Sequence, residues 1–373
     1  MSVPAIRPTE SREYRMGQFV AGVVVVLALI GVASILAHIP WGFLSPVVAL
    51  IGGVPLLNAF VKAFFVANFA ALIVLFLVWL ERKFAGWMQA RLGPMHVGWK
   101  GLAQTVADAV KLLVKEDIIP SRADRPLFVL APYLVFVPTV LAFLALPFSL
   151  TWVGYDLPLA ALYVIAVGSV ASLGILAAGW GANNKYSLLG GVRAVAQLLS
   201  YEIPMVIVVL TVVALAGTMS LVEIVQLQAG LWNIVRWPHL VVLIPGFVIY
   251  LVCALAELNR APFDLPEAES ELVSGFHTEY SGMRFSFFFL AEFANNFFSA
   301  GLAVVLFFGG SLGPWLPGPV WFTLKTVAVI LLMMWIRWTV PRLRIDQMMG
   351  FCWKVLVPAS LALFCIGAIL AVL

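Results

Sequence analysis

Acidic side chains are concentrated in one short segment, AELNRAPFDLPEAESEL, which covers residues 256–272. It carries one arginine, Arg260, and five carboxylates: Glu257, Asp264, Glu267, Glu269 and Glu271. Carboxyl groups that lie near one another, or that are partly removed from water, keep their protons to higher pH than isolated ones. The segment therefore predicts a chain of groups that can exchange protons near neutral pH.

A further acid, Glu292, lies inside the apolar run SFFFLAEFANN. An acidic residue deep in a membrane helix costs roughly 2.5–3.5 kcal/mol on insertion scales, and it normally faces a polar interior and marks an ion or proton path. Asn295 and Asn296 extend this polar spot. The structural alternative is a protonated glutamic acid that hydrogen-bonds a neighbouring helix. We favour the proton path.

Some acids of this segment can also be explained by local structure alone. Asp264, Leu265, Pro266 and Glu267 have the form of a capping box, which predicts that a short helix starts there. Pro266 is tolerated in a first turn, where its missing amide hydrogen costs little. Negative charge in a first turn is favoured by the helix dipole, which gives Glu267 and Glu269 a structural explanation. That explanation does not extend to Glu257 or Glu271.

The composition places these acids in a membrane protein. Hydrophobic residues make up 63% of the 373 residues, charged residues only 11%, and the mean hydropathy is +1.05. A helix needs about 20 apolar residues to cross the hydrocarbon core of a bilayer. Because the runs are continuous and not alternating, they predict helices and not barrel strands. The sequence predicts an all-α polytopic fold with nine membrane helices, centred on segments 19–37, 64–80, 127–150, 157–180, 203–219, 240–256, 285–308, 320–339 and 351–373.

The basic residues predict the orientation, because cytoplasmic loops hold the positive excess. With the N-terminus inside, all but Lys62, Arg236 and Lys325 of the 22 basic residues fall on the inner side. This arrangement places the acidic segment on the cytoplasmic side. The net charge of +4 follows from this bias and gives no reason to expect nucleic acid.

Metal or haem binding is not predicted. The three cysteines lie within or beside apolar helices without the close spacing of a cluster motif, and the four histidines are scattered. No Walker loop or dinucleotide fingerprint is present in the sequence.

Two inner loops carry helical patterns. In GLAQTVADAVKLLVKED, polar residues that include Asp108 recur on one face and Val106, Val110 and Leu113 on the other, which predicts an amphipathic helix. The pattern favours a helix lying at the membrane interface, and the alternative is a portal wall for a lipid-soluble substrate.

The second patterned loop leads into the fifth predicted membrane helix. Arg193, Gln197 and Tyr201 recur there at intervals of four, on one face of a helix. Glu202 follows them, and its structural explanation is that it reaches water or pairs with Arg193.

Several long motifs carry a family resemblance. ERKFAGWMQARLGP, ADAVKLLVKED, GWGANNKYSLLGGVRAVAQLLSYEIP, AELNRAPFDLPEAESELVSGFHTEYSGM and PRLRIDQMMGFCWK resemble the membrane-embedded H subunit of respiratory complex I, whose mitochondrial counterpart is NADH dehydrogenase subunit 1. The similarity implies one integral membrane domain over residues 1–373. Residues 61–373 would form the family core, and residues 1–60 an N-terminal extension with an additional helix.

The resemblance implies two sets of site residues. Residues that line or border a quinone chamber would be Arg82, Arg91, Asp108, Arg260, Asp264, Phe289, Arg342 and Arg344. The proton connection between the chamber and the membrane would use Glu202, Glu257, Glu267, Glu269, Glu271, Glu279 and Glu292. Some family members have a further acid in the fourth helix, where this sequence has GSVAS around Ser169. That relay step would be missing here or replaced by water.

The resemblance also implies partners and a location. The chain would bind no cofactor itself, and quinone would be the substrate. Other complex I subunits would carry FMN and iron–sulfur clusters, and membrane lipid would surround the chain. A bacterial plasma membrane is the expected location. Two other classes of protein are alternatives: the anchor subunit of a related membrane-bound hydrogenase, and a free-standing ion transporter. The large charged inner loops suit a docking surface better than a transporter gate.

Overall fold

The computed structural model describes residues 55–150, 152–266 and 269–372. Within these ranges the chain is helical and contains no strand. The predicted first membrane run, residues 19–37, lies outside the described residues, as do residues 1–54 of the predicted extension. The last residues of that extension, 55–60, begin the helix α3 (Pro55–Met88). The other eight predicted runs are confirmed, since eight helices are long and apolar enough to cross a membrane.

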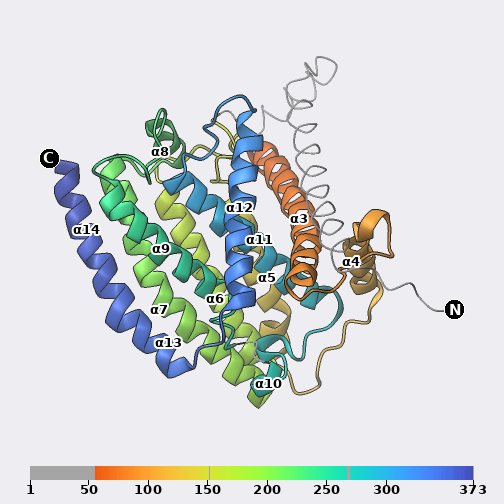
Figure 1. Cartoon of the computed structure of the whole chain (residues 1–373). Helices are drawn as coiled ribbons and strands as arrows, with labels where there is room; N and C mark the ends of the chain where they lie inside the picture. Colours follow the sequence, from red (N-terminus) through yellow and green to blue (C-terminus); the bar gives the residue numbers. More distant parts are fainter. Residues whose placement is uncertain (1–54, 151, 267–268, 373) are drawn as a thin grey trace.

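The helices follow one another along the chain with short connections (Figure 1). The elements that cross the bundle are α3 (Pro55–Met88), α5 (Arg125–Phe143), α6 (Ala160–Gly181), α7 (Lys185–Ala216), α9 (Leu240–Glu257), α11 (Gly282–Phe307), α12 (Gly318–Thr339) and α14 (Val357–Val372). Shorter elements join them: η2 (Trp99–Gly101), α4 (Gln104–Val114), α8 (Leu221–Leu227), α10 (Glu269–Leu272), η3 (Gly275–His277), α13 (Ile345–Phe351) and the π-helical turn η4 (Cys352–Leu356).

Helix α11 lies at the centre of the bundle. It packs against α3, α5, α9 and α12, and most residues of its apolar stretch are buried. Helices α3 and α4 form one edge of the molecule in Figure 1, and α14 forms the other edge against α7. The acidic Glu292 of α11 is therefore carried into the middle of the protein.

The long helix α7 shows how local sequence sets an element. Asn184 caps its start, because the side-chain oxygen accepts a hydrogen bond from the Tyr186 amide at 3.0 Å. Gly217 ends it with a left-handed φ of 71°, and the Gly217 amide bonds the Val213 carbonyl oxygen. The predicted inner loop before residue 203 is thus the first part of α7.

The predicted amphipathic helix is confirmed as α4. Val106, Val110 and Leu113 are exposed on one face, while Asp108 on the other face accepts a hydrogen bond from Gln104 at 3.0 Å. An exposed apolar stripe on a helix beside membrane-crossing elements fits a position at the membrane interface.

The short helix predicted in the acidic loop is present as α10. Leu265 and Pro266 precede it in a non-helical turn. The predicted start at Asp264 with Pro266 in the first helical turn is therefore wrong, because the residues that would form that turn are not helical and α10 begins further along the chain. The side chain of residue 267 lies outside the described part of the chain.

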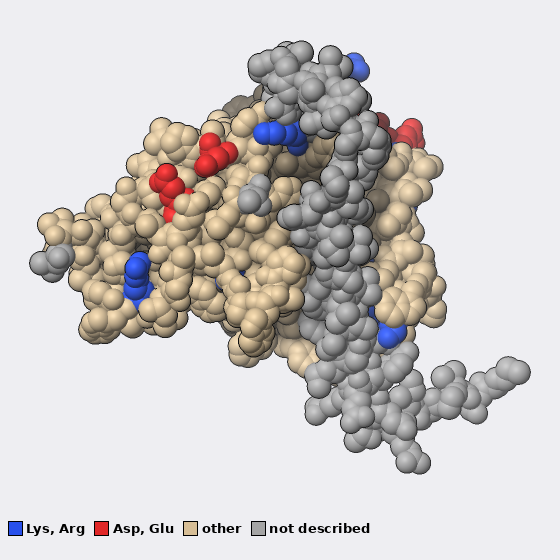
Figure 2. Space-filling view, turned by 90° about the horizontal axis from the view of Figure 1, so that it is seen from above, with Lys and Arg blue, Asp and Glu red and all other residues tan. Residues whose placement is uncertain are grey.

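The end of the bundle that carries α8 has few charged side chains in view (Figure 2). Figure 2 looks onto the end that carries α8, where the visible tan surface bears only scattered charged side chains. At this end Lys325 is buried and donates to the carbonyl oxygens of Phe308, Gly310 and Leu312 at 2.7–3.1 Å. The lysine thereby satisfies carbonyl groups just beyond the end of α11.

Candidate functional site

A cavity of roughly 500 Å³ lies between the helices. Residues of α3, α5, α6, α7, α9, α11 and α12 line it, together with η3. Most of the lining is apolar, but several ionisable side chains face it: Glu81, Arg82, Arg91, Glu202, Glu257, His277, Glu292 and Arg337. Acids and bases from several different helices thus line one cavity inside an apolar protein.

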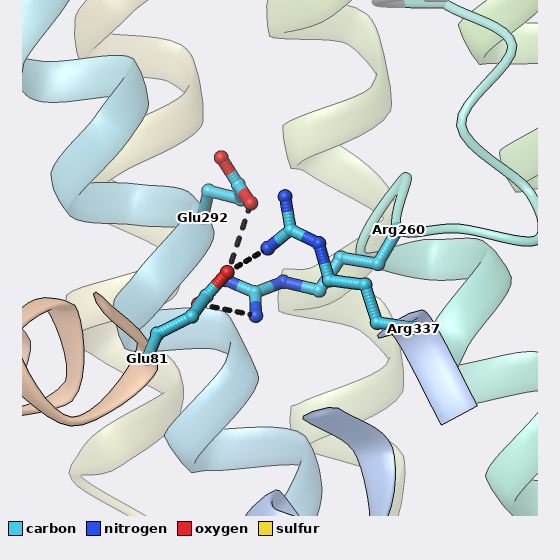
Figure 3. A network of polar contacts seen from close by, with 4 residues as sticks. All are labelled: Glu81, Arg260, Glu292 and Arg337. Atoms are coloured by element: carbon cyan, nitrogen blue, oxygen red, sulfur yellow. Dashed lines mark hydrogen bonds and ion pairs between the residues drawn. The ribbon is translucent and has the colours of Figure 1, made fainter. Parts of the chain in front are cut away.

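Four side chains form a network of ion pairs at the cavity (Figure 3). Arg260 Nη1 lies 2.8 Å from Glu81 Oε2, and Arg260 Nη2 lies 3.3 Å from Glu292 Oε1. Arg337 pairs with the other oxygen of Glu81. The Arg260 side chain is only 2% exposed, and its guanidinium lies 4.7 Å from the centre of the Phe293 ring. Two acids and two arginines thus balance each other where isolated charges would be very costly.

The loop after α9 positions Arg260. Its amide donates to the Leu255 carbonyl oxygen at 3.2 Å, which folds the chain back on the end of the helix. Gln197 of α7 fixes the loop, because its Nε2 donates to the carbonyl oxygens of Ala256 and Phe263 at 2.7 and 2.8 Å. Gln197 itself is fully buried. One amide side chain therefore binds both ends of the turn that presents Arg260.

Replacing Gln197 with leucine should loosen this turn. The substitution removes two side-chain hydrogen bonds, although the Ala256 and Phe263 carbonyl oxygens keep the backbone amides of Asn259 and Leu265 as donors. Each lost hydrogen bond costs about 0.5–1.5 kcal/mol. We expect faster limited proteolysis after Arg260 and a lower thermal midpoint for the purified complex. Gln226 of α8 is an exposed glutamine on the same chain, and Gln226→Leu serves as the control. Equal proteolysis rates in the two variants would contradict the role assigned to Gln197.

Glu202 and Glu257 line the same cavity and make a separate set of contacts. Ser169 of α6 hydrogen-bonds Glu202, and Asn295 of α11 hydrogen-bonds Glu257. Glu257 also interacts electrostatically with Glu202. The expectation that Glu202 pairs with Arg193 is wrong, because Arg193 turns toward the acidic loop and binds Glu271 at 2.7 Å.

The remaining predicted relay acids lie nearer the protein surface. The Glu271 side chain is 55% exposed in its pair with Arg193. Glu279 accepts a hydrogen bond from Asn184 at 2.6 Å. Glu269 begins α10, but its side chain, like the whole of Glu267, lies outside what the structure describes. Of the seven predicted acids, the structure brings Glu202, Glu257 and Glu292 to the cavity.

The predicted chamber residues divide in the same way. Arg82, Arg91 and Phe289 line the cavity, and Arg260 lies in the adjoining ion-pair network. The others make ion pairs outside the cavity lining: Asp108 with Arg82 at 2.6 Å, Asp264 with Arg342 at 2.8 Å, and Arg344 with Asp346 at 3.2 Å. The role of each residue toward quinone stays a prediction.

Three residues of the site were not predicted. Glu81 directly follows the apolar run predicted over residues 64–80, and Arg337 lies in the last turn of α12, so charge at these positions gives no signal in the sequence. His277 packs edge-on against the rings of Phe276 and Phe285. Burial lowers the pKa of His277 to about 4, so this imidazole is neutral at physiological pH.

Eight helices are long and apolar enough to cross a membrane, which is the mark of an integral membrane protein. Acids and arginines line a cavity in the interior of this one, where ionisable groups are costly.

Comparison with known proteins gives the family. A family model described as NADH dehydrogenase matches residues 61–368. A protein of Geobacillus kaustophilus, named as the H subunit of NADH-quinone oxidoreductase, is 54% identical over 287 residues, which are 75% of this chain and 84% of the relative. Proteins with the same name from Geobacillus thermodenitrificans and Brevibacillus brevis are 51% and 50% identical, over 80% and 77% of this chain and 89% and 85% of the relatives. The chain belongs to the H-subunit family of NADH-quinone oxidoreductase.

Proposed function

We propose that this chain is the membrane subunit that closes the quinone chamber of a proton-pumping NADH:quinone oxidoreductase and couples quinone reduction to proton translocation. The observation that carries the proposal is the shared cavity. It extends from Arg82 in the second half of α3, and Arg91 in the loop after it, to Tyr250 and Ser299, well inside α9 and α11. A redox event at one part of this space would be felt by carboxyl groups at another part.

The composition of the cavity wall suits a quinone. Val78, Ala85, Phe285 and Phe289 supply apolar surface for a hydrophobic ring and tail. Arg82 and Arg91 supply donors that would hold the carbonyl oxygens and stabilise negative charge during reduction. The names of the relatives favour a quinone substrate over the hydrogenase alternative.

The electrons would come from outside this chain. Partner subunits of the complex would carry FMN and iron–sulfur clusters and deliver electrons to the quinone. The role of this chain would be electrostatic: Glu81, Glu292, Glu257 and Glu202 would respond to the new charge or proton demand. Unit charges 4 Å apart interact by about 4 kcal/mol at an effective dielectric constant of 20, which is enough to change the protonation of a carboxyl group. The acidic loop, including Glu271, would pass this change toward Glu292 and neighbouring membrane subunits.

The location follows the charge distribution. The end with α4, α10 and α13 would face the cytoplasm of a bacterial cell, and the sparsely charged end with α8 would face outward. The exposed apolar face of α4 would contact lipid. The charged loops at the inner end would bind the peripheral subunits that complete the quinone chamber.

Narrowing the cavity tests the quinone assignment. Phe289→Trp adds volume beside Phe293, whose ring centre lies 4.7 Å away, and should hinder entry of the headgroup. We expect the KM for a short-chain quinone to rise about threefold to tenfold, since 1.4 kcal/mol of lost binding is a factor of ten. NADH oxidation with an artificial acceptor that bypasses quinone should be unchanged.

Phe65→Trp is the matched control, because the Phe65 side chain is 68% exposed on α3. It should leave the KM for quinone at its native value. Identical KM values for the Phe289→Trp variant and the native complex would show that Phe289 does not contact the quinone.

A further inference from the structure

A serine lies where two carboxyl groups from different helices approach each other. Ser169 of α6 hydrogen-bonds Glu202 of α7. Its neighbour Gly168 faces Glu257 of α9, since a Cβ atom placed on Gly168 would lie 4.0 Å from Glu257 Oε1. Ser169, Glu202 and Glu257 all line the cavity. At this level α6 therefore contributes a hydroxyl group and no acid.

The hydroxyl group of Ser169 has two partners. Its Oγ contacts Glu202 Oε1, and it also lies 3.1 Å from the carbonyl oxygen of Ile165, one turn earlier in the same helix. A hydroxyl group has one hydrogen to donate and two lone pairs that accept. Ser169 can therefore donate to Glu202 or to Ile165, but not fully to both.

These two arrangements match the two protonation states of Glu202. When Glu202 is ionised, Ser169 donates to the carboxylate. When Glu202 is protonated, the carboxyl group donates to Ser169 Oγ, and Ser169 donates to the Ile165 carbonyl oxygen. In both states the Ser169 hydroxyl group and the Glu202 oxygen that it contacts keep a hydrogen bond without movement of the heavy atoms.

We propose that Ser169 is a positioning residue whose rotating hydroxyl group keeps Glu202 hydrogen-bonded in both its protonated and its ionised state. The inference rests on the proposed function, in which Glu202 gains and loses a proton. The proton enters and leaves at the Glu202 carboxyl group. Ser169 keeps its own hydrogen throughout and only turns about its Cβ–Oγ bond.

The surroundings of Ser169 suit this role. Ser172 Oγ donates to the Ser169 carbonyl oxygen at 2.7 Å, which ties down the helix backbone beside the hydroxyl group. In the described part of the chain, Ser169 is the side chain that hydrogen-bonds Glu202. The other ionisable groups that line the same cavity are Glu81, Arg82, Arg91, Tyr250, Glu257, His277, Glu292 and Arg337.

Infrared difference spectroscopy of the assembled complex tests the proposal. Spectra recorded between acid and alkaline pH contain the C=O stretching band of protonated Glu202, identified as the band that Glu202→Gln removes. In Ser169→Ala this band should move to higher wavenumber, because the carboxyl group has lost its acceptor. Ser169→Thr keeps a hydroxyl group and should leave the band near its native position. Thr211→Val removes a hydroxyl group of α7 that bonds the Ile207 carbonyl oxygen of its own helix and lies outside the cavity lining, so it should not move the band.

Turnover gives a second readout. Quinone reduction coupled to proton pumping should fall about threefold to tenfold in Ser169→Ala, which corresponds to the loss of one hydrogen bond, and Ser169→Thr should restore it. An unmoved band in Ser169→Ala overturns the inference, and so does the absence of any band that Glu202→Gln removes. If Glu202→Gln impairs pumping while Ser169→Ala leaves the band in place, only the role of Ser169 fails. Full pumping in Glu202→Gln instead refutes the relay through Glu202 itself.

Discussion

Replacing Arg260 with methionine should abolish or nearly abolish assembly of the complex. Arg260 is 2% exposed and bridges Glu81 and Glu292, so the substitution leaves buried negative charge uncompensated. Breaking a buried ion pair by removing one partner costs about 3–5 kcal/mol, which is a large part of the stability of a typical domain. The yield of intact complex and its thermal inactivation midpoint measure the effect.

A second substitution separates lost charge balance from lost packing. Glu81 keeps Arg337 as a partner in the Arg260→Met variant, whereas Glu292 loses its ion pair with Arg260. Adding Glu292→Gln should therefore recover part of the assembly. Arg236→Met, at an exposed arginine near α8, should assemble normally. Normal assembly of Arg260→Met would show that the network does not stabilise the fold.

The membrane helices could be predicted because the bilayer leaves few alternatives. An apolar run of sufficient length must form a helix to pair its own backbone groups, and eight such runs are confirmed. Hydropathy failed at the start of α7. Residues 185–202 contain Lys185, Arg193, Gln197 and Glu202 and so look like a loop, yet they continue the membrane helix as its inner end. Their 3.6-residue periodicity was the correct signal.

Site residues could be predicted only where a charged residue stands at a position whose local structure does not favour charge. Glu292 in an apolar run and Glu257 at the end of α9 are both costly, and both line the cavity. Glu81 and Arg337 were not predicted, because charged residues are common where an apolar run or a membrane helix ends. Which acid meets which base depends on how the helices pack, and sequence spacing does not contain that information. For this reason the pairing of Arg193 with Glu271 could not be foreseen.

Packing also divides the acidic segment by depth. Asp264 and Glu271 form ion pairs with Arg342 and Arg193, and their side chains are 20% and 55% exposed. Arg260 and Glu257 of the same segment face the interior of the bundle. One loop therefore has acids at its surface and charged groups in contact with the cavity, which is the geometry that transmission of a redox signal into the membrane would require.

Glu257→Gln should stop this transmission while leaving the structure intact. Glutamine has the shape of glutamic acid and can still bond Asn295, but it cannot carry a proton. The position offers a carboxylate no structural advantage, because negative charge at the C-terminal end of α9 is opposed by the helix dipole. We expect proton pumping and quinone reduction in reconstituted vesicles to fall by about 100-fold or more, because a positioned side chain that transfers a proton typically contributes roughly 10²–10⁴-fold to the rate.

Two further variants show whether the effect belongs to the cavity. Glu292→Gln should reduce pumping as Glu257→Gln does, because both side chains line the same space. Glu223→Gln alters an acid of α8 that lies outside the cavity and is hydrogen-bonded by Thr218, so it should pump normally. If Glu257→Gln and Glu292→Gln both keep the full rate and the full ratio of protons to electrons, these acids do not carry the coupling. The buried charges would then serve only to hold the helices together.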